Sequence, residues 1–296
     1  MDDLFLGVDG GGTHCRARLC DEMGQIRGEG RAGPANVRLG VDESFAAILD
    51  ASRQCLDAAG LPLDQLRRIT ACLALAGASE PTRLAAVEAY RHPFRRVVYT
   101  NDAHAACVGA HSGRDGGVVI AGTGTVGWAV IEGKHYRVGG WGFPISDEGS
   151  GAWLGCEAIR RVLWAYDGRI EWTDLLAALF GQFRSDAHLI VQWMTLAKPR
   201  DYGRHAHTVL AYAAKDDPIA LELVQMGAAH LDALALRLIT VGAPRLAMLG
   251  GLAEPMRPWL AATTVAALST PEGNALDGAL RLARAAAVPS AAAAAA

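Results

Sequence analysis

The apolar and polar positions at the start of the chain predict two short strands joined by a glycine turn. Residues 4–8, LFLGV, form an apolar run typical of a buried strand. After the turn DGGGT at 9–13, apolar residues alternate with arginines in CRARL at 15–19, which indicates a returning strand. A third strand is expected at 25–31.

The same pattern begins again in the middle of the chain. Residues 117–121, GVVIA, form a buried strand that leads into GTGT at 122–125. Strands at 126–131 and 134–138 then repeat the opening arrangement. We interpret this repetition as an internal duplication.

Helical and strand-like segments fill the intervals between the glycine turns. Expected helices include 41–59, 80–91, 103–111, 217–241 and 274–287, and further strands are expected at 69–76, 95–100 and 245–249. The first half therefore reads β-β-β-α-β-α-β-α. Ser79 is expected to cap the helix at 80–91. The helix at 217–241 is apolar on nearly every side, so we expect it to be buried.

Composition and charge narrow the class of protein. The chain has 296 residues, 51% of them hydrophobic and 20% charged, which suits a two-domain α/β enzyme. Its net charge of −3 gives no basic field for nucleic acid. The start of the chain does not resemble a signal peptide, and Arg237 and Arg245 interrupt the longest apolar candidate for a membrane span. A cytoplasmic protein without nucleic-acid or membrane partners is expected.

The six cysteines indicate neither a zinc site nor a disulfide framework. None forms a C-x-x-C pair, and no histidine cluster lies beside them. We expect most of them to be small buried apolar residues.

The first glycine turn has the chemistry of a phosphate loop. Three consecutive glycines allow backbone N–H groups to approach a polyanion, and Thr13 adds a hydroxyl group. Asp9 supplies an oxygen ligand of the kind that Mg²⁺ prefers. A plain hairpin turn is the alternative, and the motif is neither a Walker A loop nor a Rossmann fingerprint because it lacks the lysine and a following helix.

Four turns that carry glycine or an acid follow strand ends in the chain, namely 9–13, 101–102, 122–125 and 250–251. Strand ends that face one crevice are where open α/β sheets bind ligands. With these motifs the chain resembles the BadF/BadG/BcrA/BcrD-type family of actin-like ATPases, in particular its N-acetylglucosamine and glucosamine kinases. The matching segments are GVDGGGT at 7–13, GPAN at 33–36, LALAGA at 73–78, NDAHAA at 101–106, IAGTGT at 120–125, GGWGFPISDEGSG at 139–151, PRDYG at 199–203, MLGG at 248–251 and LDGAL at 276–280.

The resemblance implies an α/β fold of two actin-like (ribonuclease H-like) lobes, built from duplicated β-β-β-α-β-α units around a nucleotide cleft. The lobes would span 1–112 and 113–272, with a last helix at about 273–290 that packs back on the first lobe. Residues 291–296 are an alanine tail that we leave out of the fold.

The resemblance also implies an ATP-dependent hexosamine kinase. PISDEGSG and PRDYG are most similar to glucosamine kinases, and N-acetylglucosamine is the alternative substrate. A non-catalytic sugar sensor or an activator-type ATPase is the alternative from another class, although activators need closely placed cluster cysteines, which this chain lacks. The implied partners are an amino sugar and MgATP. A homodimer is compatible with the sequence, which does not fix the oligomeric state.

The family motifs assign site residues one by one. Asp9 would organise Mg²⁺, and Asp102 would be the catalytic base. The nucleotide and its phosphates would contact Gly10, Gly11, Gly12, Thr13, Gly122, Thr123, Gly124, Gly250 and Gly251. The sugar would contact Asn36, Gly77, Asp102, Thr125, Gly140, Trp141, Asp147 and Glu148.

Each of these side chains also has a purely structural interpretation. Asp102 could be the N-cap of the helix at 103–111, and Asn36 could be a turn former. Asp147 and Glu148 could be first-turn acids of a helix near 150–167. Trp141 could belong to the core.

Overall fold

The computed structural model describes residues 3–78 and 80–287 and has the expected α/β architecture. The chain divides into two units, the first formed by residues 1–115 and 270–296 and the second by 116–269. The sequence-based boundaries were 112/113 and 272/273. Ser79 and the alanine tail lie outside the described residues.

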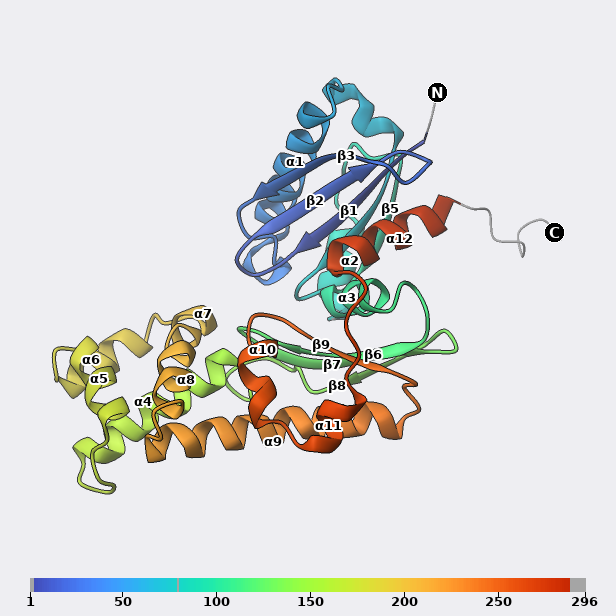
Figure 1. Cartoon of the computed structure of the whole chain (residues 1–296). Helices are drawn as coiled ribbons and strands as arrows, with labels where there is room; N and C mark the ends of the chain where they lie inside the picture. Colours follow the sequence, from blue (N-terminus) through green and yellow to red (C-terminus); the bar gives the residue numbers. More distant parts are fainter. Residues whose placement is uncertain (1–2, 79, 288–296) are drawn as a thin grey trace. The chain divides into compact units, whose positions relative to one another are not determined.

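The first unit is built on a five-stranded sheet of order β3-β2-β1-β4-β5 (Figure 1). Its strands are β1 (Leu4–Gly10), β2 (Cys15–Cys20), β3 (Ile26–Ala32), β4 (Ile69–Leu75) and β5 (Arg96–Thr100). The first three strands are antiparallel neighbours, and β1, β4 and β5 run parallel to one another. The carboxyl ends of these three parallel strands therefore meet at one edge of the sheet.

Helices cover both faces of this sheet. The helices of the unit are α1 (Val41–Ala58), α2 (Pro81–Glu88), α3 (Asp102–Ala110) and α12 (Ala275–Ala287), with 3₁₀ turns η1 (Val37–Leu39) and η2 (Leu63–Arg68). Leu6 and Val8 face a core that includes α1, whereas Phe5 faces a smaller core with α12. Helix α12 approaches β1 so closely that a Cβ atom on Gly7 would lie 2.7 Å from the Leu280 backbone nitrogen.

The second unit repeats the strand order with a four-stranded sheet, β8-β7-β6-β9. Its strands are β6 (Gly116–Ala121), β7 (Thr125–Ile131), β8 (Lys134–Val138) and β9 (Leu246–Leu249). The antiparallel and parallel pairings match those of β3-β2-β1-β4. A single parallel bridge between Leu246 and Leu268 lies where β5 stands in the first unit. The duplication predicted from sequence is therefore present in the topology.

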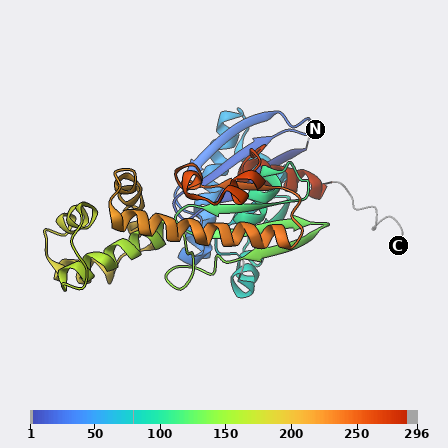
Figure 2. The ribbon, with the colours of Figure 1, turned by 60° about the horizontal axis from the view of Figure 1, so that its bottom comes forward.

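Helices supply the core of the second unit. They are α4 (Gly151–Tyr166), α5 (Asp174–Gln182), α6 (Ala187–Met194), α7 (Pro199–Gly203), α8 (Ala206–Ala213), α9 (Pro218–Thr240), α10 (Ala253–Met256) and α11 (Ala262–Ala267), with η3 (Arg257–Trp259). Figure 2 shows α9 running along the β6–β9 sheet and continuing toward the cluster formed by α4 to α8.

The expectation that the helix at 217–241 is buried was confirmed for one face only. One face of α9 carries the buried Leu223, Leu231 and Leu238, but Met226 and Leu236 are 38% and 63% exposed. Among the described residues, α9 is the one helix long and apolar enough to span a membrane, which is weak evidence because core helices pass the same test. Its buried side chains belong to the core of the second unit.

Candidate active site

Three predicted site residues of the first unit follow neighbouring strand ends. Asp9 pairs in register with Ala74 of β4, and Ala74 pairs with Thr100 of β5. Gly77 comes three residues after Ala74, and Asp102 comes two residues after Thr100. Because adjacent strands lie about 4.8 Å apart, the topology brings Asp9, Gly77 and Asp102 to one edge of the sheet.

Backbone hydrogen bonds hold the first glycine turn in place. The Gly10 carbonyl accepts from the Ala76 N–H at 2.9 Å, and the Gly11 carbonyl accepts from Ala35 at 3.1 Å. Gly10 has no room for a side chain, since a Cβ atom there would lie 2.6 Å from Leu75 Cδ2. Gly12 and Thr13 are exposed at the tip of the turn. The loop is thus fixed at its base and accessible at the positions predicted to bind phosphate.

Asp9 stands at the end of β1 and pairs with an arginine that the sequence analysis missed. Its Oδ2 lies 2.5 Å from Arg16 Nη2, and 14% of its side chain is exposed. The signal for this pair is the hairpin register, which sets residue 9 opposite residue 16. No group of three or more acidic, histidine or cysteine ligands occurs among the described residues. A single carboxylate still fits Mg²⁺, which keeps several waters and is commonly bound by one or two carboxylates and substrate phosphates.

Asn36 lies between the first glycine turn and the turn after β4. A Cβ atom on Gly12 would lie 3.7 Å from Asn36 Nδ2, and one on Gly77 would lie 2.8 Å from Asn36 Oδ1. The same Oδ1 accepts from the Arg38 N–H at 2.9 Å and so caps η1. The fold therefore gathers three predicted residues from three separate motifs, while Asn36 also acts as a turn former.

Asp102 is not the N-cap of the helix that follows β5. The cap is Asn101, whose Oδ1 accepts from the His104 N–H at 2.7 Å. Asp102 is the first helical residue, and its Oδ1 accepts from the N–H of Ala103 at 3.0 Å. The capping interpretation of Asp102 was wrong by one residue because asparagine and aspartate are about equally good caps.

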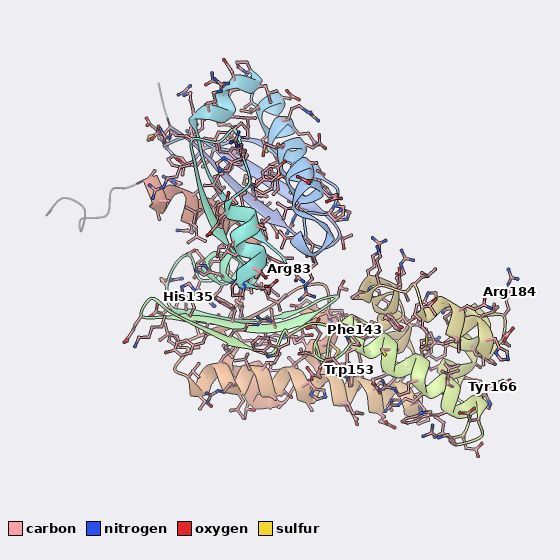
Figure 3. The ribbon with its side chains drawn as sticks, turned by 180° about the vertical axis from the view of Figure 1, so that it is seen from behind. Arg83, His135, Phe143, Trp153, Tyr166 and Arg184 are labelled. Atoms are coloured by element: carbon pink, nitrogen blue, oxygen red, sulfur yellow. The ribbon has the colours of Figure 1, made fainter. Side chains whose placement is uncertain are left out.

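The second glycine turn is attached to the beginning of α4. The N–H groups of Gly151 and Ala152 donate to the carbonyls of Gly122 and Thr123 at 2.8 and 3.1 Å. Ser150 caps α4 by accepting from the Trp153 N–H at 3.1 Å. Figure 3 labels Trp153 on this helix and Phe143 in the loop that precedes it.

The turn after β9 packs closely on the end of β6. Gly250 has a φ of +98°, and a Cβ atom there would overlap the Ala121 carbonyl oxygen. That oxygen also accepts from the Leu252 N–H at 3.0 Å. Gly250 and Gly251 therefore follow β9 beside the strand end that leads into Gly122.

Asp147 holds the 139–149 loop together beside the second glycine turn. Its two carboxylate oxygens accept from the N–H groups of Gly142 and Phe143, both at 3.2 Å. A Cβ atom on Gly124 would lie 2.8 Å from Asp147 Oδ2. Asp147 has a φ of 68° and precedes the cap of α4. The interpretation of Asp147 and Glu148 as first-turn acids was therefore wrong.

Trp141 is not a core residue, because it is 71% exposed. The guanidinium carbon of Arg137 lies 4.1 Å from the centre of its ring. Arg137 also donates to the Gly139 carbonyl at 3.0 Å and to the Gly140 carbonyl. Gly140 needs its φ of +68° and its missing side chain, since a Cβ atom would lie 2.6 Å from that of Val126. Arg137 was not among the predicted site residues, and its one signal in the sequence is its place just before the Gly-Gly-Trp segment.

The PRDYG segment forms α7 and lies beside the same loops. The ring of Tyr202 is 5.0 Å from that of Phe143, centre to centre. A Cβ atom on Gly203 would lie 3.8 Å from Thr123 Cγ2. Nearby, Thr125 at the start of β7 has a buried Oγ1 without a hydrogen-bond partner among the described residues. A sugar hydroxyl group would satisfy such an oxygen.

The remaining acid, Glu148, belongs to the same loop. Its Oε2 accepts from the Ser146 hydroxyl at 3.3 Å, and that hydroxyl oxygen accepts from the Trp141 N–H at 3.3 Å. The second unit thus collects its predicted residues around the end of β6, as the first unit does around the end of β1.

Comparison with known proteins gives a consistent family. The model of the BadF/BadG/BcrA/BcrD ATPase family matches residues 6–260. The chain is 39% identical over 281 residues to the glucosamine kinase GspK of Vibrio cholerae, covering 95% of this chain and 96% of the relative.

Solved structures show the same fold. A protein of Chromobacterium violaceum, provisionally assigned as an N-acetylglucosamine kinase, superimposes with a TM-score of 0.90 at 32% identity, covering 95% of this chain and 99% of that one. A ROK family glucokinase from Streptomyces griseus, solved with glucose and AMPPNP, gives a TM-score of 0.56 at 21% identity over 95% of this chain and 99% of that one. These neighbours establish the actin-like ATPase fold.

Proposed function

Because the chain belongs to the BadF/BadG/BcrA/BcrD ATPase family, we propose that it is an ATP-dependent amino-sugar kinase that phosphorylates D-glucosamine on its 6-hydroxyl group. The observation that carries this proposal is the 39% identity to a glucosamine kinase over 95% of the chain. N-Acetylglucosamine is the second candidate substrate, favoured by the TM-score of 0.90 to the Chromobacterium protein.

The two glycine turns are proposed to bind the phosphates of ATP. Each turn lies at the end of the first strand of its unit, with Thr13 or Thr123 exposed in it. Exposed backbone N–H groups in such turns form anion-binding concavities. Gly250 and Gly251 are proposed to leave space for the adenosine. Asp9 would hold Mg²⁺ through its carboxylate, and the ion would neutralise developing charge on the phosphates.

Asp102 is proposed to be the catalytic base. It lies at the first position of α3, at the same sheet edge as Asp9, and its side chain is half-buried. One carboxylate oxygen already accepts from the Ala103 N–H, which orients the group. The other is the proposed acceptor of the 6-hydroxyl proton as that oxygen attacks the γ-phosphorus. Phosphoryl transfer depends mainly on positioning and charge stabilisation, so one oriented base is sufficient.

Each unit, taken by itself, carries residues that we propose contact the sugar. Asn36 and Gly77 supply an amide and a turn in the first unit, and Thr125 supplies an unpaired buried hydroxyl in the second. Trp141 offers an exposed ring, and Glu148 offers a carboxylate for a 2-ammonium group. Both carboxylate oxygens of Asp147 accept from backbone N–H groups. We therefore propose that Asp147 holds the conformation of the Gly140–Trp141 loop, in addition to any contact with the sugar.

A coupled assay with ATP and a panel of sugars tests the function. We expect kcat/KM for glucosamine to exceed that for N-acetylglucosamine and glucose. A glucose preference of more than about tenfold, equal to about 1.4 kcal/mol of transition-state binding, would refute the amino-sugar proposal. The absence of phosphorylation of any sugar would instead support the sensor or activator alternatives. The cytoplasmic location is a prediction that cell fractionation tests. Sedimentation measures the oligomeric state.

A further inference from the structure

A pocket of about 370 Å³ lies in the first unit, away from every residue assigned above. Its wall includes Cys20 at the end of β2, Ser112 after α3, and Arg281 and Arg284 on α12. Cys20 pairs in register with Phe5, near the beginning of β1. Since strands rise about 3.3 Å per residue, this end of the sheet is about 13 Å from Asp9. A small ligand in the pocket therefore does not reach the first glycine turn.

The wall of the pocket carries two acids and two arginines. Its two acids are already paired with arginines that lie outside its wall. Asp277 Oδ1 is 2.5 Å from Nη1 of Arg18, which also pairs with Glu29 at 2.6 Å, and Glu272 pairs with Arg114. The two arginines of the wall have no such carboxylate partner among the described residues: Arg284 donates to a neutral carbonyl, that of Glu22, at 3.1 Å, and Arg281 makes no hydrogen bond or ion pair there. Two guanidinium groups are thus available to an anion.

Glycines at the wall let the segments around the pocket approach one another closely. A Cβ atom on Gly24 would lie 2.7 Å from Arg284 Nη1, and one on Gly273 would lie 3.1 Å from the Gly109 carbonyl oxygen. Gly24 also has a φ of +81°. The close approach of the β2–β3 turn to α12 fixes the Arg284 guanidinium, because Arg284 bonds to that turn. A preorganised guanidinium loses less freedom on binding an anion.

The pocket also lies where the chain leaves and re-enters the first unit. The units are connected at 115/116 and at 269/270, and Ser112 and Glu272 lie within a few residues of these points. Glu272 fastens the two connecting segments together, because its N–H donates to the Ala110 carbonyl at 2.9 Å and its carboxylate pairs with Arg114. A ligand in the pocket contacts both segments.

From this geometry we propose that the pocket is a second anion site, which binds a phosphate group through Arg281 and Arg284. The group is either free phosphate or the phosphate of a small phosphomonoester. Arginine guanidinium groups are well suited to phosphate oxygens in shape and charge. The proposal does not depend on the amino-sugar kinase activity, because binding is measured without turnover.

Hydrogen–deuterium exchange of the full chain tests the site. We expect phosphate, but not chloride at matched ionic strength, to slow exchange in the segments 20–28 and 270–287. The Arg281→Gln plus Arg284→Gln variant should require at least about tenfold more phosphate for the same protection. Titration with glycerol 3-phosphate beside inorganic phosphate identifies the source, since the tighter binder shows whether the site prefers an ester or the free ion.

Two control variants show whether the protection arises from the pocket itself or from a general loss of positive charge. The variant Arg67→Gln plus Arg91→Gln removes the same charge from exposed positions of the same unit and should respond like the unmodified chain. Arg281→Gln alone removes no described interaction, so it should fold normally and still weaken protection. Unchanged protection in the Arg281 and Arg284 variants would overturn the proposal, as would an absence of protection in both segments.

Discussion

Replacing Asp102 by asparagine separates catalysis from helix capping. Asn101, not Asp102, caps α3, and the Asp102 Oδ1 accepts a hydrogen bond from the Ala103 N–H. An asparagine carbonyl oxygen can accept the same bond, so we expect Asp102→Asn to fold and to bind ATP normally. The amide cannot take a proton from the sugar. Loss of a general base typically costs about 10²–10⁴-fold in rate, so kcat should fall by at least about a hundredfold, or about 2.7 kcal/mol.

The neighbouring cap provides the matched control. Asn101→Ala removes the side chain that accepts from the His104 N–H and should lower the free energy of unfolding by about 1 kcal/mol. We expect this variant to lose stability with a much smaller loss of turnover than Asp102→Asn. Initial rates at saturating ATP and sugar, together with urea unfolding of both variants, measure the two effects. Near-normal turnover in Asp102→Asn would refute the assignment of Asp102 as base.

Three further predictions address the second unit. Gly250→Ala should destabilise the protein, because its Cβ atom would overlap the carbonyl oxygen at the end of β6. Gly122→Ala should keep the melting temperature, because its Cβ atom meets none of the described residues within 4 Å. Equal melting temperatures of the two variants would contradict this close packing. Arg137→Gln should shift tryptophan emission and raise the KM for sugar more than the KM for ATP, because Arg137 contacts the Trp141 ring and the Gly139 carbonyl. In a Trp141→Phe background, most of the emission shift should disappear. A shift of the same size in that background would contradict the contact between Arg137 and Trp141. Burial lowers the pKa of His205 below its ordinary value of 6.5, so as the pH falls the unfolded chain takes up a proton before the folded chain does. The free energy of unfolding should therefore fall as the pH drops below about 6.5, and urea unfolding should show a smaller fall for His205→Gln. An equal fall in the variant would exclude His205 as the cause.

Much of the fold could be predicted from local sequence. The strands of both units and the long helices follow directly from apolar periodicity, and the repeated strand–turn–strand pattern indicates the duplication. The burial predicted for α9 holds for one face only, because hydropathy does not tell which face of an apolar helix meets its neighbours. Met226 and Leu236 are apolar and yet exposed.

The site was less predictable where it depends on register and on helix ends. Family motifs point to Asp9, but its partner Arg16 follows only from the register of the hairpin. Whether Asn101 or Asp102 caps α3 depends on the exact first residue of the helix, which sequence propensities do not determine to within one residue. Arg137 belongs to no segment that matches the family. Its contacts are visible only in the structure, where its guanidinium donates to the carbonyls of Gly139 and Gly140.

The placement of α12 has a consequence for how the protein is synthesised. This helix covers one face of the first sheet, yet the ribosome makes it only after the whole of residues 116–269. Until then Phe5 and Gly7 have no α12 to pack against. The second unit, which is continuous in sequence, can complete its core earlier, so the amino-terminal unit is the last to mature. A nascent chain halted before residue 275 should therefore expose apolar surface and recruit chaperones, whereas residues 116–269 should already resist proteolysis.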